Sequence, residues 1–258
     1  MFSAIVAMLA VEDAGHRMSA HADPQKAPLY LGDHTVNCWV PQVSTDMYLD
    51  TRDRGIVAHL CRGRGWEPSV TRTFVDTVQS NWTVVDVGAN FGWYTLHWAN
   101  KIRSFRGAGK VISIEASPRT YDLLSTSVEN AGLLGSPVSI HNVAATDHAG
   151  VVAFTSTPDR SLNNHVVEVP RATGGGTAAV APGTVQVQAV ALDAILQQEK
   201  RVDFIKIDVE GFEALAWEGL QATLDKNPNC IARLSPVHDR PPWSPCSHAA
   251  KSSICSDS

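Results

Sequence analysis

The sequence has little that would suit a membrane or a nucleic acid. No apolar run approaches the roughly 18 residues that a membrane-spanning helix needs. The net charge is -5, and no basic run is interleaved with aromatic residues, which argues against binding by phosphate neutralisation. The start, MFSAIVAMLAVEDAG, lacks a basic leader, so it predicts a helix or an irregular terminus rather than a signal peptide. We therefore expect a cytoplasmic protein with neither a membrane nor a nucleic-acid partner.

Cysteine motifs are also missing. The five cysteines include no Cys-x-x-Cys pair, so neither a zinc site nor a redox motif is indicated, and we predict no metal. Their odd number and scattered spacing are typical of a protein kept in a reducing compartment. The cysteines are Cys38, Cys61, Cys230, Cys246 and Cys255.

The composition suits one globular domain with a sizeable core, since 44% of the residues are hydrophobic and 18% are charged. We divide the chain into an N-terminal extension over 1–49, a main domain over 50–232 and a tail over 233–258. The tail is rich in serine and proline and has no periodicity, so disorder or an aberrant end is predicted there.

Within the main domain, apolar strands alternate with helices. Strands are predicted over 83–87, 110–116, 138–144 and 202–211. Helices are predicted over 50–80 with a break at a Gly-Arg-Gly sequence, and over 91–103, 118–131 and 212–224. This alternation indicates an α/β fold with a doubly wound, mostly parallel sheet, whose strands are apolar because both faces are covered. Segments 151–157 and 184–192 instead alternate like antiparallel or edge strands, on either side of a Gly/Ala-rich loop over 172–183.

An acid and two glycines close the first strand, in VVDVGANFGWYT over residues 84–95. Ligands of such sheets bind beyond the carboxyl ends of the strands. Gly88 would let the backbone approach a ligand, Asn90 tolerates a left-handed conformation, and Gly92 would let the next helix pack closely. A pyrophosphate site prefers G-x-G-x-x-G, whereas Asp86 here favours a cation such as S-adenosylmethionine. The alternative is a structural turn with a solvated aspartate.

The next two strands end in residues that suit a nucleoside. Glu115 follows the glycine turn by roughly 20 residues, where related folds place an acid that accepts hydrogen bonds from ribose hydroxyls. Asn142 and Ala144 end the third strand and would flank the adenine, the first by hydrogen bonding and the second by leaving room. An ordinary surface acid and an ordinary strand end remain the alternatives.

The fourth strand, IKIDVEG, carries three charges that share one face, because Lys206, Asp208 and Glu210 alternate. Such charges on a buried strand are costly unless they are paired or functional. The two acids fall at the carboxyl end, beside the loop of the first strand, and Lys206 would neutralise them. A purely structural ion network is the alternative.

Together, VVDVGANFGWYT, VISIEASP, NVAATDHAG and VDFIKIDVEGFEALAWEG resemble the FkbM family of S-adenosylmethionine-dependent methyltransferases, over roughly residues 50–232. The resemblance implies a class I methyltransferase fold, which is Rossmann-like. For most members it also implies O-methylation of a hydroxyl on a sugar, polyketide or other small molecule. The expected partner is thus a small-molecule or glycan acceptor.

The resemblance also implies roles for particular residues. It places Asp208 and Glu210 at the reacting centre with Lys206, and Asp208 is the first choice for a base or an acceptor-orienting group. His165 is a weaker candidate for the base. The implied cofactor-binding residues are Asp86, Gly88, Asn90, Gly92, Glu115, Asn142 and Ala144.

The resemblance weakens at the C-terminus. A strand begins at Cys230, but Arg233 onward does not continue it, whereas the family pattern continues with more sheet. We therefore expect a sheet that lacks its last strands. Two alternatives stay open: a methyltransferase-like domain that is inactive because its end is incomplete, and a nicotinamide-dependent oxidoreductase, against which the missing G-x-G-x-x-G counts.

Overall fold

The computed structural model describes residues 27–155, 166–167 and 184–234. The predicted Gly/Ala-rich loop, His165 and most of the predicted tail lie outside these residues. In the part of the chain that is described, no helix combines the length and the apolar character needed to cross a bilayer.

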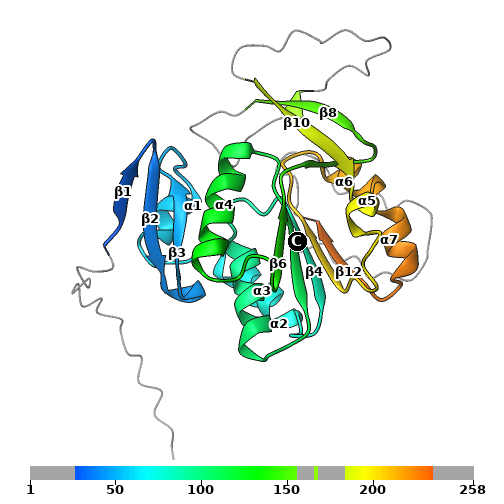
Figure 1. The fold of residues 1–258 in the computed structure, drawn as a ribbon, viewed down its shortest axis with the longest axis horizontal. Coiled ribbons are helices and arrows are strands. Elements are labelled where there is room, and N and C mark those ends of the chain that lie inside the picture. The colour runs from blue at the N-terminus through cyan, green and yellow to red at the C-terminus, as the bar shows by residue number, and fades with distance from the viewer. Residues whose placement is uncertain (1–26, 156–165, 168–183, 235–258) are drawn as a thin grey trace, which may run out of the picture.

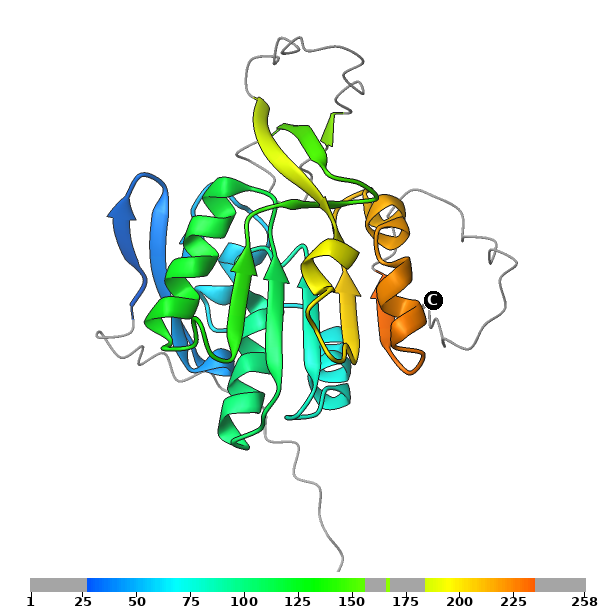
Figure 2. The ribbon, with the colours of Figure 1, turned by 45° about the vertical axis from the view of Figure 1, so that its right-hand side comes forward.

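A parallel sheet of five strands lies at the centre of the described residues (Figures 1 and 2). Its strands, in spatial order, are β12 (Ile231–Leu234), β11 (Phe204–Ile207), β4 (Thr83–Val87), β5 (Lys110–Ile114) and β6 (Val138–His141). The chain runs outward from β4 to β6 and then returns to β11 and β12, so the strand order reverses between β4 and β11. The predicted doubly wound, mostly parallel sheet is confirmed, and its point of reversal is where such sheets bind ligands.

Helices cover both faces of this sheet, which is why its strands are apolar almost throughout. Neighbouring residues of β4 show the consequence, because Val84 packs into one core and Val85 into the other. One face carries α2 (Pro68–Thr77), α3 (Trp93–Ser104) and α4 (Pro118–Asn130). The other face carries α5 (Leu192–Leu196), α6 (Glu213–Glu218) and α7 (Gln221–Lys226).

Two predicted elements are divided in the structure. The helix predicted over 212–224 is two helices, α6 and α7, that meet at Gly219, where a Cβ would lie 2.0 Å from the carbonyl oxygen of Thr146. The strand predicted over 138–144 ends with β6 at His141, and the chain then enters a different sheet as β7 (Ala144–Thr146). Close packing on Thr146 accompanies the first break, and the pairing of β7 with β10 accompanies the second.

The second sheet has the order β7-β10-β8-β9 and lies beyond the ends toward which the central strands point (Figure 2). Its β8 and β10 pair antiparallel, as predicted, and β10 pairs parallel with β7. The bounds are Gly150–Thr155 for β8, Val166–Val167 for β9 and Thr184–Ala191 for β10.

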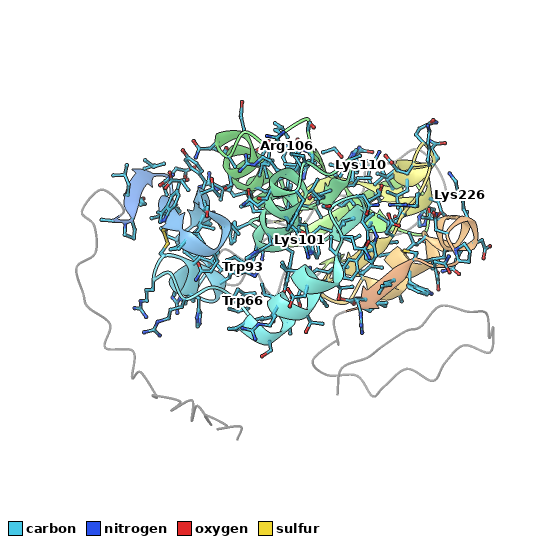
Figure 3. The ribbon with its side chains drawn as sticks, turned by 90° about the horizontal axis from the view of Figure 1, so that it is seen from below. Trp66, Trp93, Lys101, Arg106, Lys110 and Lys226 are labelled. Carbon is cyan, nitrogen blue, oxygen red and sulfur yellow. A yellow bond between two sulfur atoms is a disulfide. The ribbon has the colours of Figure 1, made fainter. Side chains whose placement is uncertain are left out.

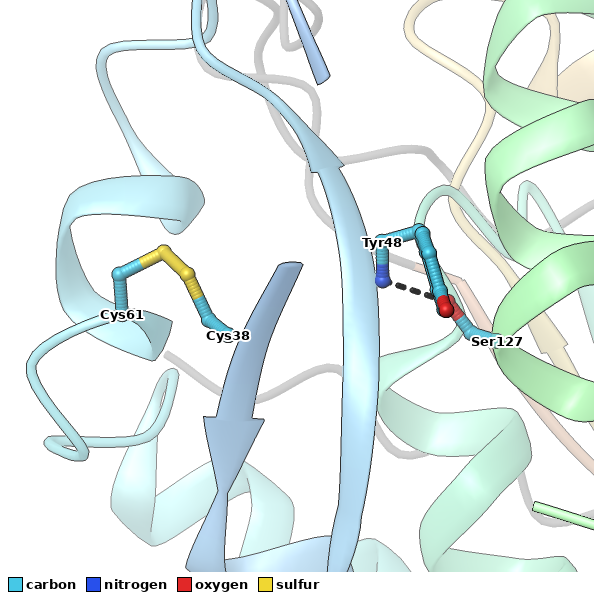
Figure 4. The surroundings of a disulfide bond; sticks show 4 residues. All are labelled: Cys38, Tyr48, Cys61 and Ser127. Atoms are coloured by element: carbon cyan, nitrogen blue, oxygen red, sulfur yellow. Dashed lines mark hydrogen bonds between the residues drawn. A yellow bond between two sulfur atoms is a disulfide. The ribbon is translucent and has the colours of Figure 1, made fainter. Parts of the chain in front are cut away.

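The described part of the predicted N-terminal extension is an antiparallel meander that packs on α4 (Figure 1). Its strands are β1 (Leu29–Gly32), β2 (Thr35–Val40) and β3 (Thr45–Asp50), and α1 (Ile56–Leu60) follows. The Tyr48 amide donates to the Ser127 hydroxyl at 2.8 Å, which ties β3 to α4 (Figure 4). Apolar side chains of the meander belong to the same core as α2, α3 and α4, so the predicted boundary after residue 49 falls within a packed strand.

The expectation that the cysteines stay reduced is wrong for one pair. Cys38 of β2 and Cys61, just after α1, form a disulfide (Figure 4). The meander brings these two residues together, and no spacing rule in the sequence announces it. Disulfides are typical of oxidising compartments, so the cysteines do not support the predicted reducing one. Among the described residues Cys230 is free, and it is buried.

Candidate active site

A pocket opens at the carboxyl edge of the central sheet, at the reversal between β4 and β11. Loops after β4, β5, β6 and β11 form most of it, as the Rossmann-like pattern predicts. The predicted site residues that line it are Gly88, Asn90, Glu115, Ala144, Lys206, Asp208 and Glu210. Three others, Asp86, Gly92 and Asn142, lie behind the lining.

Asp86 is the acid that ends the first strand, and it is fully buried at 0% exposure. Its Oδ2 atom accepts a hydrogen bond from the Thr95 hydroxyl at 2.7 Å, and the Thr95 hydroxyl also lies 2.8 Å from that of Ser113. Its Oδ1 atom lies 3.5 Å from the Lys206 ammonium. Asp86 therefore acts on the pocket through Lys206.

Lys206 lies between two carboxylates. Its Nζ atom is 3.5 Å from Asp86 and 3.3 Å from Asp208, and it donates to the Gly88 carbonyl at 3.4 Å. The Tyr94 ring centroid is 5.2 Å away. Burial alone would lower the pKa of Lys206, but the carboxylates of Asp208 and Asp86 outweigh it and hold that pKa above its usual value. Lys206 thus remains an ammonium that holds one oxygen of Asp208.

Gly88 and Gly92, in the loop after β4, are each required for a different reason. Gly88 has φ +75, and a Cβ there would lie 1.9 Å from the carbonyl oxygen of Asp208, so the loops after β4 and β11 touch backbone to backbone. Gly92 has φ +90, and a Cβ there would lie 2.4 Å from a methyl group of Leu124 in α4. The predicted packing role of Gly92 therefore concerns α4. Asn90 adopts the expected left-handed conformation, with φ +50.

Glu115 joins the loops after β4 and β5. Its two carboxylate oxygens each accept one backbone amide, from Asn90 and from Ser117, both at 2.9 Å. Burial raises the pKa of Glu115 to about 6, although both amides lower it. The Asn142 amide donates to the carbonyl oxygens of Glu115 at 2.8 Å and Ala116 at 3.1 Å, so it braces this loop.

Aromatic residues that no sequence motif indicated form one wall of the pocket. The wall includes Trp66, Trp93, Tyr94 and Phe212. Trp66 comes from the segment between α1 and α2 and lines the pocket together with Trp93; both are labelled in Figure 3. A Cβ at the neighbouring Gly65 would lie 3.2 Å from the Trp93 ring, so this segment packs closely on Trp93. The Tyr94 hydroxyl donates to Glu67 at 3.1 Å. Burial, with the Glu67 carboxylate beside it, raises the pKa of Tyr94 far above its usual value, so the phenol stays neutral.

This strand order, with its pocket at the reversal and its D-x-G-x-N-x-G loop, is that of a Rossmann-like, class I methyltransferase fold. A family model, the Methyltransferase FkbM domain, matches residues 86–244, which is more than half of the chain. The protein belongs to this family of methyltransferases. The expectation that the last strand stops before Arg233 is wrong, because β12 includes Arg233 and Leu234, which pair with Lys206 and Ile207 of β11. No curated protein matches the chain.

Solved structures resemble the chain at low identity. Methyltransferase FkbM from Methylobacillus flagellatus is 16% identical with a TM-score of 0.45, over 70% of this chain and 41% of that one. TYW2 from P. horikoshii, in complex with MeSAdo, is 19% identical with a TM-score of 0.32, over 46% and 41%. A Plasmodium falciparum protein in complex with S-adenosyl-L-homocysteine is 12% identical with a TM-score of 0.27, over 45% and 44%. The chain thus spans less than half the length of each.

Proposed function

We propose that the pocket binds S-adenosylmethionine and that the protein transfers a methyl group to a hydroxyl of a small molecule or glycan. The charge of the pocket carries this proposal. Its charged lining consists of three carboxylates, Glu115, Asp208 and Glu210, and one ammonium, Lys206, which is already paired with Asp86 behind it. Excess negative charge favours a ligand with a sulfonium and an amino group. The pyrophosphate of a nicotinamide cofactor would meet the same carboxylates and be repelled.

The remaining polar atoms fit this cofactor. Among the described residues, the Asn90 Oδ1 atom is buried at the pocket and accepts no hydrogen bond, so it suits a donor such as the amino group. Each oxygen of Glu115 uses one lone pair for a backbone amide and keeps another for a ribose hydroxyl. Ala144, with Val143 beside it, offers a small apolar surface for the adenine ring.

S-adenosylmethionine would supply an electrophilic methyl group for in-line transfer from its sulfonium to the acceptor oxygen, with S-adenosylhomocysteine as the leaving group. The protein contributes mainly by positioning the two reactants. Asp208, whose side chain is 39% exposed, accepts the proton of the acceptor hydroxyl. Lys206 occupies the Oδ2 atom of Asp208 and thereby orients the carboxylate. Glu210 lines the same pocket and is a second acceptor for hydroxyl groups.

The test is methyl transfer from S-adenosylmethionine labelled in its methyl group to a panel of glycosides and small alcohols, followed by mass spectrometry. The wild type is expected to methylate at least one compound on a hydroxyl. Asp208→Asn is expected to bind the cofactor and lose most of the transfer, whereas Asp225→Asn, an exposed change on α7, is expected to match the wild type. Cofactor binding without transfer to any compound would instead support an inactive domain.

A further inference from the structure

One buried carboxylate near the pocket has no part in the mechanism above. Glu213 begins α6 and is only 6% exposed, yet it does not line the pocket. Its Oε2 atom accepts the Gly211 amide at 2.9 Å, and its Oε1 atom accepts the amides of Val209 and Gly211, both at 3.2 Å. The carboxylate thus reaches back to the turn that precedes its own helix.

That turn has an unfavourable backbone. Glu210 has φ +50 and Gly211 has φ +96, and only glycine adopts such angles without cost. A non-glycine residue persists there when the surrounding structure holds it. Charge-assisted hydrogen bonds from a buried carboxylate to two amides of the turn supply this restraint. Glu213 therefore fixes the conformation in which Glu210 lies at the pocket.

The turn also supports the cofactor loop. The Asp208 amide donates to the Val87 carbonyl at 3.0 Å. The Asp208 carbonyl oxygen fills the space that a Cβ at Gly88 would occupy, at 1.9 Å. Because the two loops touch without side chains between them, a shift of the turn displaces the loop that carries Asn90.

We propose that Glu213 is a positioning residue for methyl transfer, which holds the turn 208–212 so that Asp208 and Glu210 face the reactants and the Gly88 loop keeps its shape. The inference rests on the proposed function. It differs from a merely structural role, because a helix-start carboxylate that only adds stability would leave ligand affinity unchanged in the folded protein.

The experiment compares the full chain with Glu213→Ala, Glu213→Gln and Glu218→Ala, the last removing an exposed acid of the same helix. Calorimetry with S-adenosylhomocysteine gives the Kd, and hydrogen exchange reports the amides of Val209 and Gly211. Glu213→Ala is expected to raise the Kd about tenfold or more and to speed exchange at both amides. Glu213→Gln keeps one acceptor oxygen, so an intermediate Kd is expected, and Glu218→Ala is expected to match the wild type.

Unchanged affinity in a folded Glu213→Ala variant, with or without a lower Tm, would overturn the inference. If that variant does not fold, Glu213→Gln decides, and a wild-type Kd for it would equally overturn the inference. Failure of the wild type to bind S-adenosylhomocysteine would sink the proposed function together with this inference. If the wild type binds S-adenosylhomocysteine and the Glu213 variants bind it with the same Kd, this inference alone would be refuted.

Discussion

Removing the Cys38–Cys61 disulfide is expected to destabilise the protein by about 3.5 kcal/mol. The bond joins residues with a sequence separation of 23, so it closes a loop of about 24 residues in the unfolded chain. The chain-entropy relation then gives a loss of about 12 cal/mol/K, or about 3.5 kcal/mol at 25 °C. The bond also anchors the segment that leads to Trp66, so its loss is expected to loosen one wall of the pocket.

The assay is urea unfolding of the wild type and of the Cys38→Ala/Cys61→Ala variant, each with and without dithiothreitol. The midpoint of the wild type should fall by about 1 M or more in reductant and approach that of the variant, which reductant should not change. Cys230→Ala, which removes the free buried thiol, should keep the response of the wild type to reductant. A wild-type midpoint that reductant leaves unchanged would refute the reasoning. So would a digest of the unreduced protein in which mass spectrometry finds no peptide pair joined through Cys38 and Cys61.

Three further predictions concern the pocket. Gly88→Ala places a Cβ 1.9 Å from the Asp208 carbonyl oxygen at a φ of +75, so the free energy of unfolding in urea should fall by about 2 kcal/mol or more. A variant as stable as the wild type would contradict the backbone contact. Lys206→Ala leaves Asp86 buried without its counter-ion, so the free energy of unfolding should fall by about 3–5 kcal/mol. Adding Asp86→Ala should restore part of that stability, and a double variant no more stable than Lys206→Ala would contradict the pairing. Because the pKa of Glu115 is raised to about 6 from 4.5, its ionisation opposes folding, and stability should fall by about 2 kcal/mol as the pH rises through that interval. Unfolding midpoints across this range should show that decline relative to Glu115→Gln, and parallel curves would contradict it.

The fold was largely predictable because each strand of the central sheet has apolar side chains on both faces, and because strands alternate with helices along the sequence. Val84 and Val85 enter opposite cores, which only a sheet covered on both sides permits. The position of the site followed from the same logic, since parallel strands present their carboxyl ends at one edge. Glu115 and Asp208 therefore reached the pocket from distant parts of the sequence.

Features that depend on tertiary contacts could not be predicted in this way. The helical period runs on through Gly219, yet close packing on Thr146 ends α6 there. Asp86 ends its strand as a ligand residue would, but its depth and its pairing with Lys206 appear only once the strands are in register. Trp66 carries no local signal for the pocket, because the segment between α1 and α2 brings it there.

The most direct test of the central claim is a calorimetric titration of the wild type and of Glu115→Ala with S-adenosylmethionine. We expect micromolar binding by the wild type. We expect an affinity at least tenfold weaker for the variant, because Glu115 both holds the Asn90 loop and offers acceptor oxygens to the ribose. A folded wild type that releases no heat of binding, or a folded variant that binds as tightly as the wild type, would contradict the account.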